Sequence, residues 1–273
     1  MNYVTTADKT RLYVKDWGSG KPVILLHGWP LSADSWDDQA MALADAGYRA
    51  ISYDRRGFGR SSQPWSGYDY DTLADDLASV MLQTGAQDAV LVGFSMGGGE
   101  VARYMSRHGG KDVRRAVLVS SVVPFMLKTA DNPDGTDQSV FEDMTHGMKE
   151  DRAKFFAGFF KDFYGVSLLG NSVSAELVEA SCNTAMQASL KATLACAASF
   201  ATTDFRGDLI AFKVPTLIIH GADDQTVPID AAGRAAAKGI KDATLIEYAG
   251  APHGLLATHK SLITDDLLDF IGR

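Results

Sequence analysis

The sequence is poor in the residues that would point to a disulfide-stapled, metal-bound or nucleic-acid-binding protein. Only two of its 273 residues are cysteine, Cys182 and Cys196, and neither lies in a CxxC pair or near a histidine cluster. This excludes a disulfide framework and gives no signal for a metal site, so we expect two reduced, buried thiols. The net charge is −8, and the sequence has no block of lysine and arginine that could bind phosphate groups. Nucleic acid is therefore not an expected partner.

Long apolar runs are also absent. No uninterrupted stretch is long enough to span a bilayer, and the opening MNYVTTADKT has no basic region followed by an apolar segment. We therefore expect no membrane partner and a cytoplasmic location. With 46% hydrophobic and 22% charged residues, the composition is that of an ordinary globular protein with a sizeable core.

What the chain does have is a regular alternation of short apolar, β-rich runs with helical patterns. The run TRLYVKDWG is expected to form the second strand of an N-terminal hairpin. Six further strands are expected at residues 22–28, 48–54, 89–95, 115–121, 215–221 and 243–250. Near-continuous apolar strands separated by helices predict an α/β fold, with a mostly parallel, eight-stranded sheet covered by helices on both faces.

Residues 122–211 break this alternation, because they hold helical patterns and no strong strand. We interpret them as a helical cap inserted between two core segments, 1–121 and 212–273. Most of its many phenylalanines are expected to hold the cap onto the sheet, while one or two could line an apolar acyl pocket. The candidate pocket residues are Phe125, Phe159, Phe160, Phe200 and, after the next strand, Val227.

A single serine stands between glycines in the stretch VLVGFSMGGG. It is Ser95, in the pattern Gly93-Phe94-Ser95-Met96-Gly97, at the end of an expected strand and the start of an expected helix. This is the nucleophile elbow, in which small flanking residues let the backbone turn sharply and expose the serine hydroxyl. A tight turn with an idle serine is the alternative, but the strand-to-helix context favours a catalytic serine.

A serine nucleophile needs a base and an orienting acid, which folds with this elbow supply in the chain order Ser, Asp, His. Two aspartates follow the strand expected at 215–221, in the stretch ADDQTVP. Asp224 is preferred because it stands four residues before Pro228, in a D-x-x-V-P arrangement. Asp223 is then a turn residue, and a solvated turn carboxylate is the alternative for both.

Six histidines compete for the role of base. Four of them, His27, His108, His146 and His220, precede the last expected strand. His253 follows it in the stretch AGAPHG, a loop that can carry the ring over the sheet, whereas His259 opens the final helical pattern. We therefore predict that His253 takes the Ser95 proton and that Asp224 fixes its tautomer.

Acyl transfer also needs N–H donors for the oxyanion. The backbone N–H of Met96 is one, because it lies at a helix N-terminus, where the dipole favours negative charge. The second is expected from the stretch HGWP as the N–H of Trp29, since Pro30 has none. His27 is interpreted as structural, and the charged loop YDRRGFGRSSQP is expected to bind neighbouring loops together without a catalytic part.

Several motifs carry a resemblance to a known family. They are HGWP, YDRRGFGRS, GFSMGGGEVARY, SLKAT, TDFRGD and APHG. Together they resemble the cofactor-free haloperoxidases and aryl esterases of the α/β-hydrolase fold, sometimes called perhydrolases, over nearly the whole chain. The resemblance implies the triad Ser95, Asp224 and His253, with Trp29 and Met96 as oxyanion donors. It also implies short-chain acyl esters as substrates, no metal or haem cofactor, and frequent homo-oligomers.

The expected reaction is ester hydrolysis through an acyl-enzyme on Ser95. Hydrogen peroxide in place of water would yield a peracid, which can oxidise halide. A lactonase or γ-lactamase of the same fold is one alternative, and a non-catalytic ligand-binding protein is another, although a complete triad counts against it. Dehalogenation of haloalkanes is disfavoured, because that chemistry uses an aspartate at the position of Ser95.

Pro30 is a candidate for the use of peroxide. Proline restricts the residue before it to extended conformations, which limits the directions of the Trp29 carbonyl. If that carbonyl points into the site, it can accept a hydrogen bond from the attacking peroxide and favour it over water. The alternative is that Pro30 only stiffens the loop.

Overall fold

The chain folds around one twisted sheet, seen in a computed structural model that describes residues 2–167 and 173–272. In this described part, eight strands follow the order β1-β2-β4-β3-β5-β6-β7-β8. The strands are β1 (Tyr3–Thr5), β2 (Arg11–Gly18), β3 (Pro22–Leu26), β4 (Arg49–Tyr53), β5 (Ala89–Phe94), β6 (Val113–Val119), β7 (Thr216–Gly221) and β8 (Ala243–Tyr248). β1 pairs with β2 and β2 with β4 in antiparallel fashion, and the other pairs are parallel. The predicted α/β-hydrolase sheet is confirmed.

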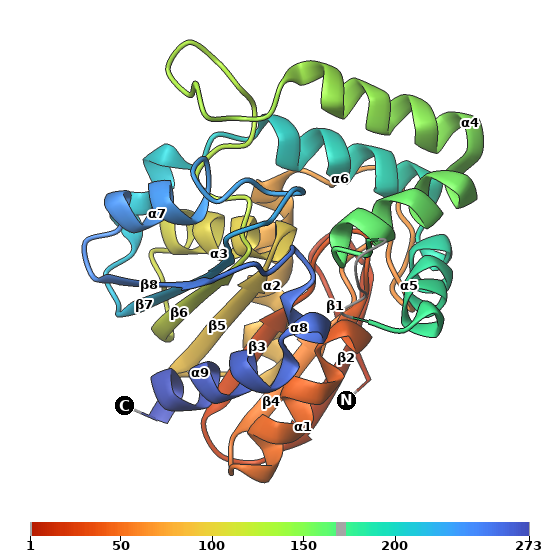
Figure 1. The fold of residues 1–273 in the computed structure, drawn as a ribbon. Helices are drawn as coiled ribbons and strands as arrows, with labels where there is room; N and C mark the ends of the chain where they lie inside the picture. The colour runs from red at the N-terminus through yellow and green to blue at the C-terminus, as the bar shows by residue number, and fades with distance from the viewer. Residues whose placement is uncertain (1, 168–172, 273) are drawn as a thin grey trace.

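Helices cover both faces of this sheet, as Figure 1 shows. On one face α1 (Asp37–Asp45) packs against α9 (Lys260–Gly272), and on the other α2 (Tyr70–Thr84) packs against α3 (Met96–Arg107). Shorter helices α7 (Gly233–Gly239) and α8 (Leu255–Thr258) accompany the last strands. Strands β3, β5 and β7 are buried along their whole length, because they are covered from both sides.

Local chemistry sets the ends of the helices. The Asp69 side chain caps α2 by accepting a hydrogen bond from the Thr72 N–H, and Gly85 ends the helix in the left-handed region at φ 65°. The strands begin and end within about two residues of the bounds expected from the sequence. None of the helices in the described part of the chain is long and apolar enough to cross a membrane.

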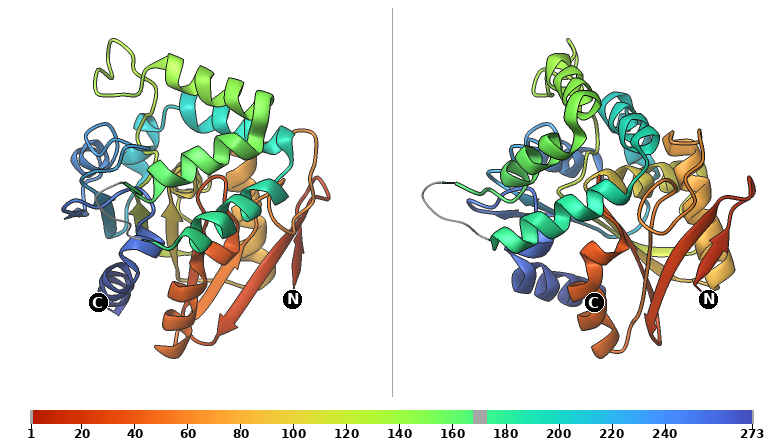
Figure 2. Two further views of the ribbon diagram at one scale, coloured as in Figure 1. Left: turned by 45° about the vertical axis from the view of Figure 1, so that its right-hand side comes forward. Right: turned by 90° about the vertical axis from the view of Figure 1, so that its right-hand side faces the viewer.

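Three longer helices lie between β6 and β7, above the carboxyl ends of the strands (Figures 1 and 2). They are α4 (Gln138–Phe163), α5 (Ala175–Gln187) and α6 (Leu190–Thr202). Helix α6 starts anew after α5, because the Ser189 side chain caps it by accepting a hydrogen bond from the Ala192 N–H. All three helices fall within residues 122–211, and we keep the division into core and cap at those bounds as a proposal.

The aromatic residues of α4 hold this helical layer in place. Phe156, Phe160 and Phe163 are spaced by four and three residues and are no more than 1% exposed. Asp151 interrupts the helix with non-helical backbone angles, φ −151° and ψ 91°, so the two halves of α4 run in different directions. Phe155 and Phe159, on the neighbouring side, are only partly buried.

Candidate active site

Ser95 occupies a sharp turn between β5 and α3. Its φ of 54° is unusual for a residue with a side chain, and its ψ is −118°. Glycine is required two positions earlier, because a Cβ on Gly93 would lie 2.5 Å from the Gly97 carbonyl oxygen. The turn thus carries the Ser95 hydroxyl beyond the end of the sheet, as the GxSxG pattern predicts.

Three loops that follow parallel strands bring Ser95, His253 and Asp224 together. His253 Nε2 lies 2.9 Å from Ser95 Oγ, and His253 Nδ1 lies 2.7 Å from Asp224 Oδ2. The three residues are 6%, 1% and 4% exposed. A base within hydrogen-bond distance of a hydroxyl, oriented by a carboxylate on its other nitrogen, is the arrangement that activates a serine.

Asp224 is held on both carboxylate oxygens. Oδ1 accepts the backbone N–H groups of Thr226 and Val227 at 2.9 and 2.8 Å. Although burial alone would raise the pKa of Asp224, the charge of His253 and hydrogen bonds from His220 and His253 lower it well below its usual value. The group is therefore a carboxylate at neutral pH.

His220 is a neighbour that the sequence reading did not assign to this site. Its Nε2 lies 2.9 Å from the Val227 carbonyl oxygen and 3.4 Å from Asp224 Oδ2. The stretch IIHG, which ends β7 as LLHG ends β3, was the available signal. Asp223, in contrast, is exposed, and His259 Nδ1 contacts Thr258 Oγ1 at 2.9 Å outside the site.

Two aromatic rings enclose the His253 imidazole. Phe94 lies 5.2 Å from it, centroid to centroid, and Phe163 of α4 lies 4.9 Å away in an edge-on arrangement. The Gly254 N–H also donates to the Phe163 carbonyl at 2.8 Å. The helical layer therefore packs directly against the candidate base and excludes water from one side of it.

The loop after β3 carries one of the two predicted oxyanion donors, the N–H of Trp29, and passes close to Ser95. A Cβ on Gly28 would lie 3.1 Å from the Ser95 Cβ, so the loop backbone approaches the serine closely. Trp29 follows, with its indole Nε1–H donating to the Thr193 carbonyl at 3.1 Å, and its peptide bond to Pro30 is cis. Met96 is the first residue of α3, and its N–H is among the unpaired donors of the helix N-terminus.

A small cavity lies over the Ser95 hydroxyl. Its volume is about 60 Å³, and its walls include four of the predicted residues, Trp29, Phe159, Phe200 and Val227. By this measure one water needs about 10–15 Å³, so the cavity has room for a few water molecules or a small acyl group. Further lining residues that the sequence reading did not name are Val122, Met126, Phe141 and Met144.

Three predicted pocket residues lie outside this cavity. Phe160 is fully buried and packs among Phe156 and Phe163 on the inner side of α4. Phe125 instead lies beneath the Arg206 guanidinium, 5.1 Å from the ring centroid. Pro30 is buried next to the cavity-lining Trp29 but is not itself part of the wall.

The cavity continues into a broad groove between α4 and the loop after β7. The groove has a volume of about 750 Å³ and shares Val140, Met144, Phe159, Gln225 and Thr226 with the cavity. Charged side chains, among them Glu150, Lys154 and Asp162, also line it. Because the two share these five lining residues, the groove adjoins the cavity that Ser95 lines.

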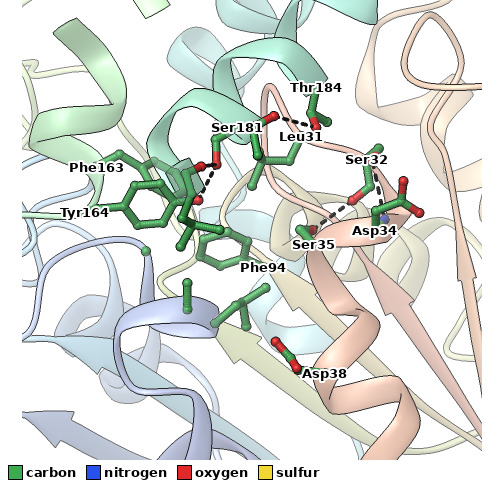
Figure 3. A pocket seen from close by; sticks show the side chains of 15 residues that line it. Leu31, Ser32, Asp34, Ser35, Asp38, Phe94, Phe163, Tyr164, Ser181 and Thr184 are labelled. Carbon is green, nitrogen blue, oxygen red and sulfur yellow. Dashed lines mark hydrogen bonds between the residues drawn. The ribbon is translucent and has the colours of Figure 1, made fainter. Parts of the chain in front are cut away.

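A separate cavity of about 240 Å³ lies behind His253. Figure 3 shows Phe163 and Tyr164 on one side of it and Ser32 and Asp34 on the other, with Phe94 beneath. The rings of Phe94 and Phe163 contact both this cavity and the imidazole, so they form a wall between the two. Ser95 lines only the smaller cavity of the two.

Neither the two cysteines nor any group of metal-ligating side chains forms a second candidate site among the described residues. Cys196 is buried, which raises the pKa of its thiol to about 12, and Cys182 is partly exposed rather than buried as expected. No three histidine, cysteine or carboxylate side chains among the described residues are grouped so that they could hold a metal ion.

Comparison with known proteins agrees with the fold and the loops described here. A model of the α/β-hydrolase fold matches residues 21–260. The chain is 43% identical to a non-haem chloroperoxidase from Kitasatospora aureofaciens over all of both chains. It is 44% identical to a bifunctional esterase/perhydrolase from Acinetobacter calcoaceticus, with 99% of each chain covered. A crystal structure of a bromoperoxidase from Bacillus anthracis superposes over all of both chains with a TM-score of 0.96 and 43% identity.

The chain belongs to the α/β-hydrolase family and, within it, to the branch of non-haem haloperoxidases and esterase/perhydrolases. The family resemblance inferred from the sequence motifs is thereby confirmed. The chain is an enzyme of this fold, and its family includes proteins named for two activities, ester hydrolysis and halide oxidation.

Proposed function

We propose that this enzyme hydrolyses short-chain or aryl carboxylic esters through an acyl-enzyme on Ser95, and that hydrogen peroxide can replace water as the acyl acceptor. The observation that carries the proposal is the continuous hydrogen-bond chain from Ser95 Oγ through His253 to Asp224, with a small apolar cavity directly over the hydroxyl. The related esterase/perhydrolase and the non-haem chloroperoxidase support the pairing of the two acyl acceptors.

The proposed chemistry assigns one role to each group. Ser95 Oγ attacks the ester carbonyl while His253 Nε2 takes its proton, and Asp224 stabilises the resulting imidazolium. The N–H groups of Trp29 and Met96 hold the oxyanion. His253 then protonates the leaving alkoxide, which departs as the alcohol and leaves the acyl group on Ser95.

The second half-reaction repeats these steps with a small nucleophile. His253 takes a proton from water, the hydroxide oxygen bonds to the acyl carbon, and the bond to Ser95 Oγ breaks while His253 returns its proton to that oxygen and a carboxylic acid leaves. If hydrogen peroxide is the nucleophile, the product is the corresponding peracid and Ser95 is restored in the same way. The peracid can then oxidise halide in solution without a metal or haem.

The size of the cavity supports a short acyl group. About 60 Å³ admits a chain of a few atoms against Phe159, Phe200 and Val227. The adjoining groove, of about 750 Å³, has space for an aryl leaving group. We therefore expect aryl acetates and propionates to be better substrates than esters of long-chain acids.

A panel of chromogenic aryl esters tests the proposal, each assayed with and without hydrogen peroxide and with and without a chelator. We expect turnover of acetate and propionate esters, peracid formation when peroxide is present, and no effect of the chelator. The matched control is Ser95→Ala, for which loss of the nucleophile typically costs on the order of 10⁶ in rate. Substantial ester turnover by folded Ser95→Ala, or turnover of lactones alone, would contradict the proposal.

Two broader expectations belong to the same proposal. Homo-oligomers are implied by the family resemblance, and the exposed side chains of Trp65, Leu82 and Ile210 offer apolar surface for such contacts. Action in the cytoplasm follows from the sequence reading alone. Light scattering of the purified protein and fractionation of cells that express it test the two expectations separately.

A further inference from the structure

A buried ion pair contacts the loop after β3, residues 27–30, which carries the predicted donor Trp29 and is called the oxyanion loop below. This pair has no part in the chemistry described so far. Arg55, in the loop after β4, pairs with Glu100 of α3, and both side chains are 1% exposed. Glu100 also accepts a hydrogen bond from the Tyr53 hydroxyl at 2.8 Å. Moving two charges from water into the interior costs free energy, which can exceed the attraction between them. A contribution to the stability of the fold therefore does not by itself explain this ion pair.

The Arg55 side chain and backbone both reach His27, at the start of the oxyanion loop. Arg55 Nη2 donates to the His27 carbonyl at 2.6 Å, and the Arg55 backbone N–H donates to His27 Nε2 at 3.0 Å. Burial and the charge of Arg55 lower the pKa of His27 well below its usual value, so the ring is neutral. Because Nε2 accepts, the single ring proton is on Nδ1.

That proton is directed at the peptide that carries a predicted oxyanion donor. His27 Nδ1 lies 2.8 Å from the Gly28 carbonyl oxygen, which also accepts the Leu31 N–H at 3.0 Å. The Gly28 carbonyl and the Trp29 N–H belong to one planar trans peptide and point in opposite directions. Any contact that fixes the Gly28 oxygen therefore fixes the direction of the Trp29 N–H.

Glu100 connects this arrangement to the other donor. It lies in the second turn of α3, the helix that starts at Met96 directly after Ser95. Arg55 thus contacts the loop that carries Trp29 and the helix that carries Met96 at the same time. Its fork of N–H groups makes these contacts together, which a single ammonium group cannot do.

We propose that the Arg55–Glu100 pair is a positioning element for the oxyanion site, which acts through His27 to hold the Trp29 N–H in register with Ser95 and the Met96 N–H. The proposal rests on the proposed function, since it assumes an oxyanion at Ser95. Arg55, His27 and Glu100 do not touch the substrate. They reduce the freedom of a donor whose benefit depends on its direction.

Arg55→Lys is the informative variant, because it keeps a positive charge beside Glu100 but loses the fork that reaches His27. Arg56→Lys is its matched control. Arg56 is the next residue, is equally buried, and forms a two-bond ion pair with buried Asp76 at 2.6 Å for each bond. Both variants should lower the melting temperature, and only Arg55→Lys should disturb the oxyanion loop.

Removal of an oxyanion donor lowers kcat by about 10²–10³, so a donor that is misdirected but present should cost roughly 10–100-fold. For Arg55→Lys we expect that loss in kcat with KM little changed, because the donor acts on the transition state. The affinity for an arylboronic acid, whose tetrahedral Ser95 adduct places an oxygen at the donors, should fall by a similar factor. Arg56→Lys should change kcat and boronate affinity by less than about threefold.

Hydrogen–deuterium exchange of peptides that cover residues 24–33 provides a readout independent of catalysis. We expect faster exchange there in Arg55→Lys than in Arg56→Lys or the wild type. Equal exchange in the two variants, or equal losses of kcat and boronate affinity, would overturn the positioning role and leave the pair structural. If the wild type turned over no ester, the proposed function would fail, while the exchange comparison would still decide whether Arg55 holds the loop.

Discussion

Asp223 and Asp224 are neighbours in the chain with opposite surroundings. Asp224 is 4% exposed and contacts His253, whereas Asp223 is exposed and its backbone N–H is bonded to the Ala251 carbonyl at 3.1 Å. The turn after β7 therefore directs the Asp223 carboxylate to solvent and the Asp224 carboxylate into the site. The proposed function depends on this difference in burial, because only the Asp224 carboxylate can orient the His253 ring.

We predict that Asp224→Asn lowers kcat for aryl acetate hydrolysis by about 10⁴, because an amide at this position favours the wrong imidazole tautomer. Asp223→Asn should remain within about twofold of the wild type. The measurement is steady-state kinetics on variants of matched purity, with circular dichroism to show that both are folded. The reverse ranking would mean that the triad is assigned to the wrong aspartate.

The sequence singled out the three residues that the structure brings together, because their signals are local. GxSxG, D-x-x-V-P and the His–Gly pair each lie at the end of a strand, and parallel strands bring these ends to one edge of the sheet. His220 is also near Asp224 in sequence, but its signal, the stretch IIHG, marks the end of a strand and does not show that the side chain contacts Asp224.

At the scale of elements, the sequence pattern of α4 does not predict which of its aromatic residues line the cavity. A helical period predicts which side chains share a face, but the interruption at Asp151 rotates the second half of α4. In this second half, Phe159 lines the cavity beside Ser95, while Phe160, the next residue around the helix, is fully buried in the core. The same limit applies to Arg55 and Glu100, which are 45 residues apart and meet only through tertiary packing.

This difference leads to a prediction about substrate length. Phe200→Leu should enlarge the cavity wall beside Ser95 and raise the ratio of kcat/KM for aryl butyrate to that for aryl acetate by about tenfold, as expected when one or two methylene groups gain space. Phe160→Leu also shortens a buried aromatic residue but should leave the ratio unchanged. Equal shifts in both variants would indicate a general loosening of the helical layer instead of a defined acyl site.

The oxyanion loop supports a second prediction at this scale. Pro30 follows Trp29, and a proline limits the conformations of the residue before it. If the Trp29 carbonyl accepts a hydrogen bond from the attacking peroxide, Pro30→Leu should lower the ratio of peracid formation to ester hydrolysis. Both rates are measured on one enzyme preparation with the same acyl donor. An unchanged ratio would leave Pro30 as a residue that only stiffens the loop.

At the scale of the whole molecule, the chain carries a net charge of −8, and several of its carboxylates have lowered pKa values because basic side chains lie beside them. Hydrogen bonds from Arg107 lower the pKa of Asp75, and hydrogen bonds from Arg206 lower that of Asp204. Both pairs are at the surface, so each contributes little to stability. Asp224 is different, because its lowered pKa is set in the interior.

The lowered carboxylate pKa values determine the direction in which the stability of the fold changes with pH. Such a group binds fewer protons in the folded chain than in the unfolded one, so its stabilisation is complete above the unfolded pKa, near 4, and is lost as the pH falls toward the folded pKa. We therefore expect these carboxylates to lower the melting temperature below about pH 4. His27 adds a decline that begins near pH 6.5, because burial and the charge of Arg55 lower its pKa in the folded chain only.

A titration of the melting temperature against pH isolates the contribution of Asp224. Asp224→Asn lacks the interior carboxylate, so its melting temperature should fall less than that of the wild type between about pH 5 and 3. Asp223→Asn should follow the wild type over the same range. Identical acid profiles for the two variants would show that Asp224 carries no stabilising charge interaction in the fold, and would remove the basis for its role beside His253.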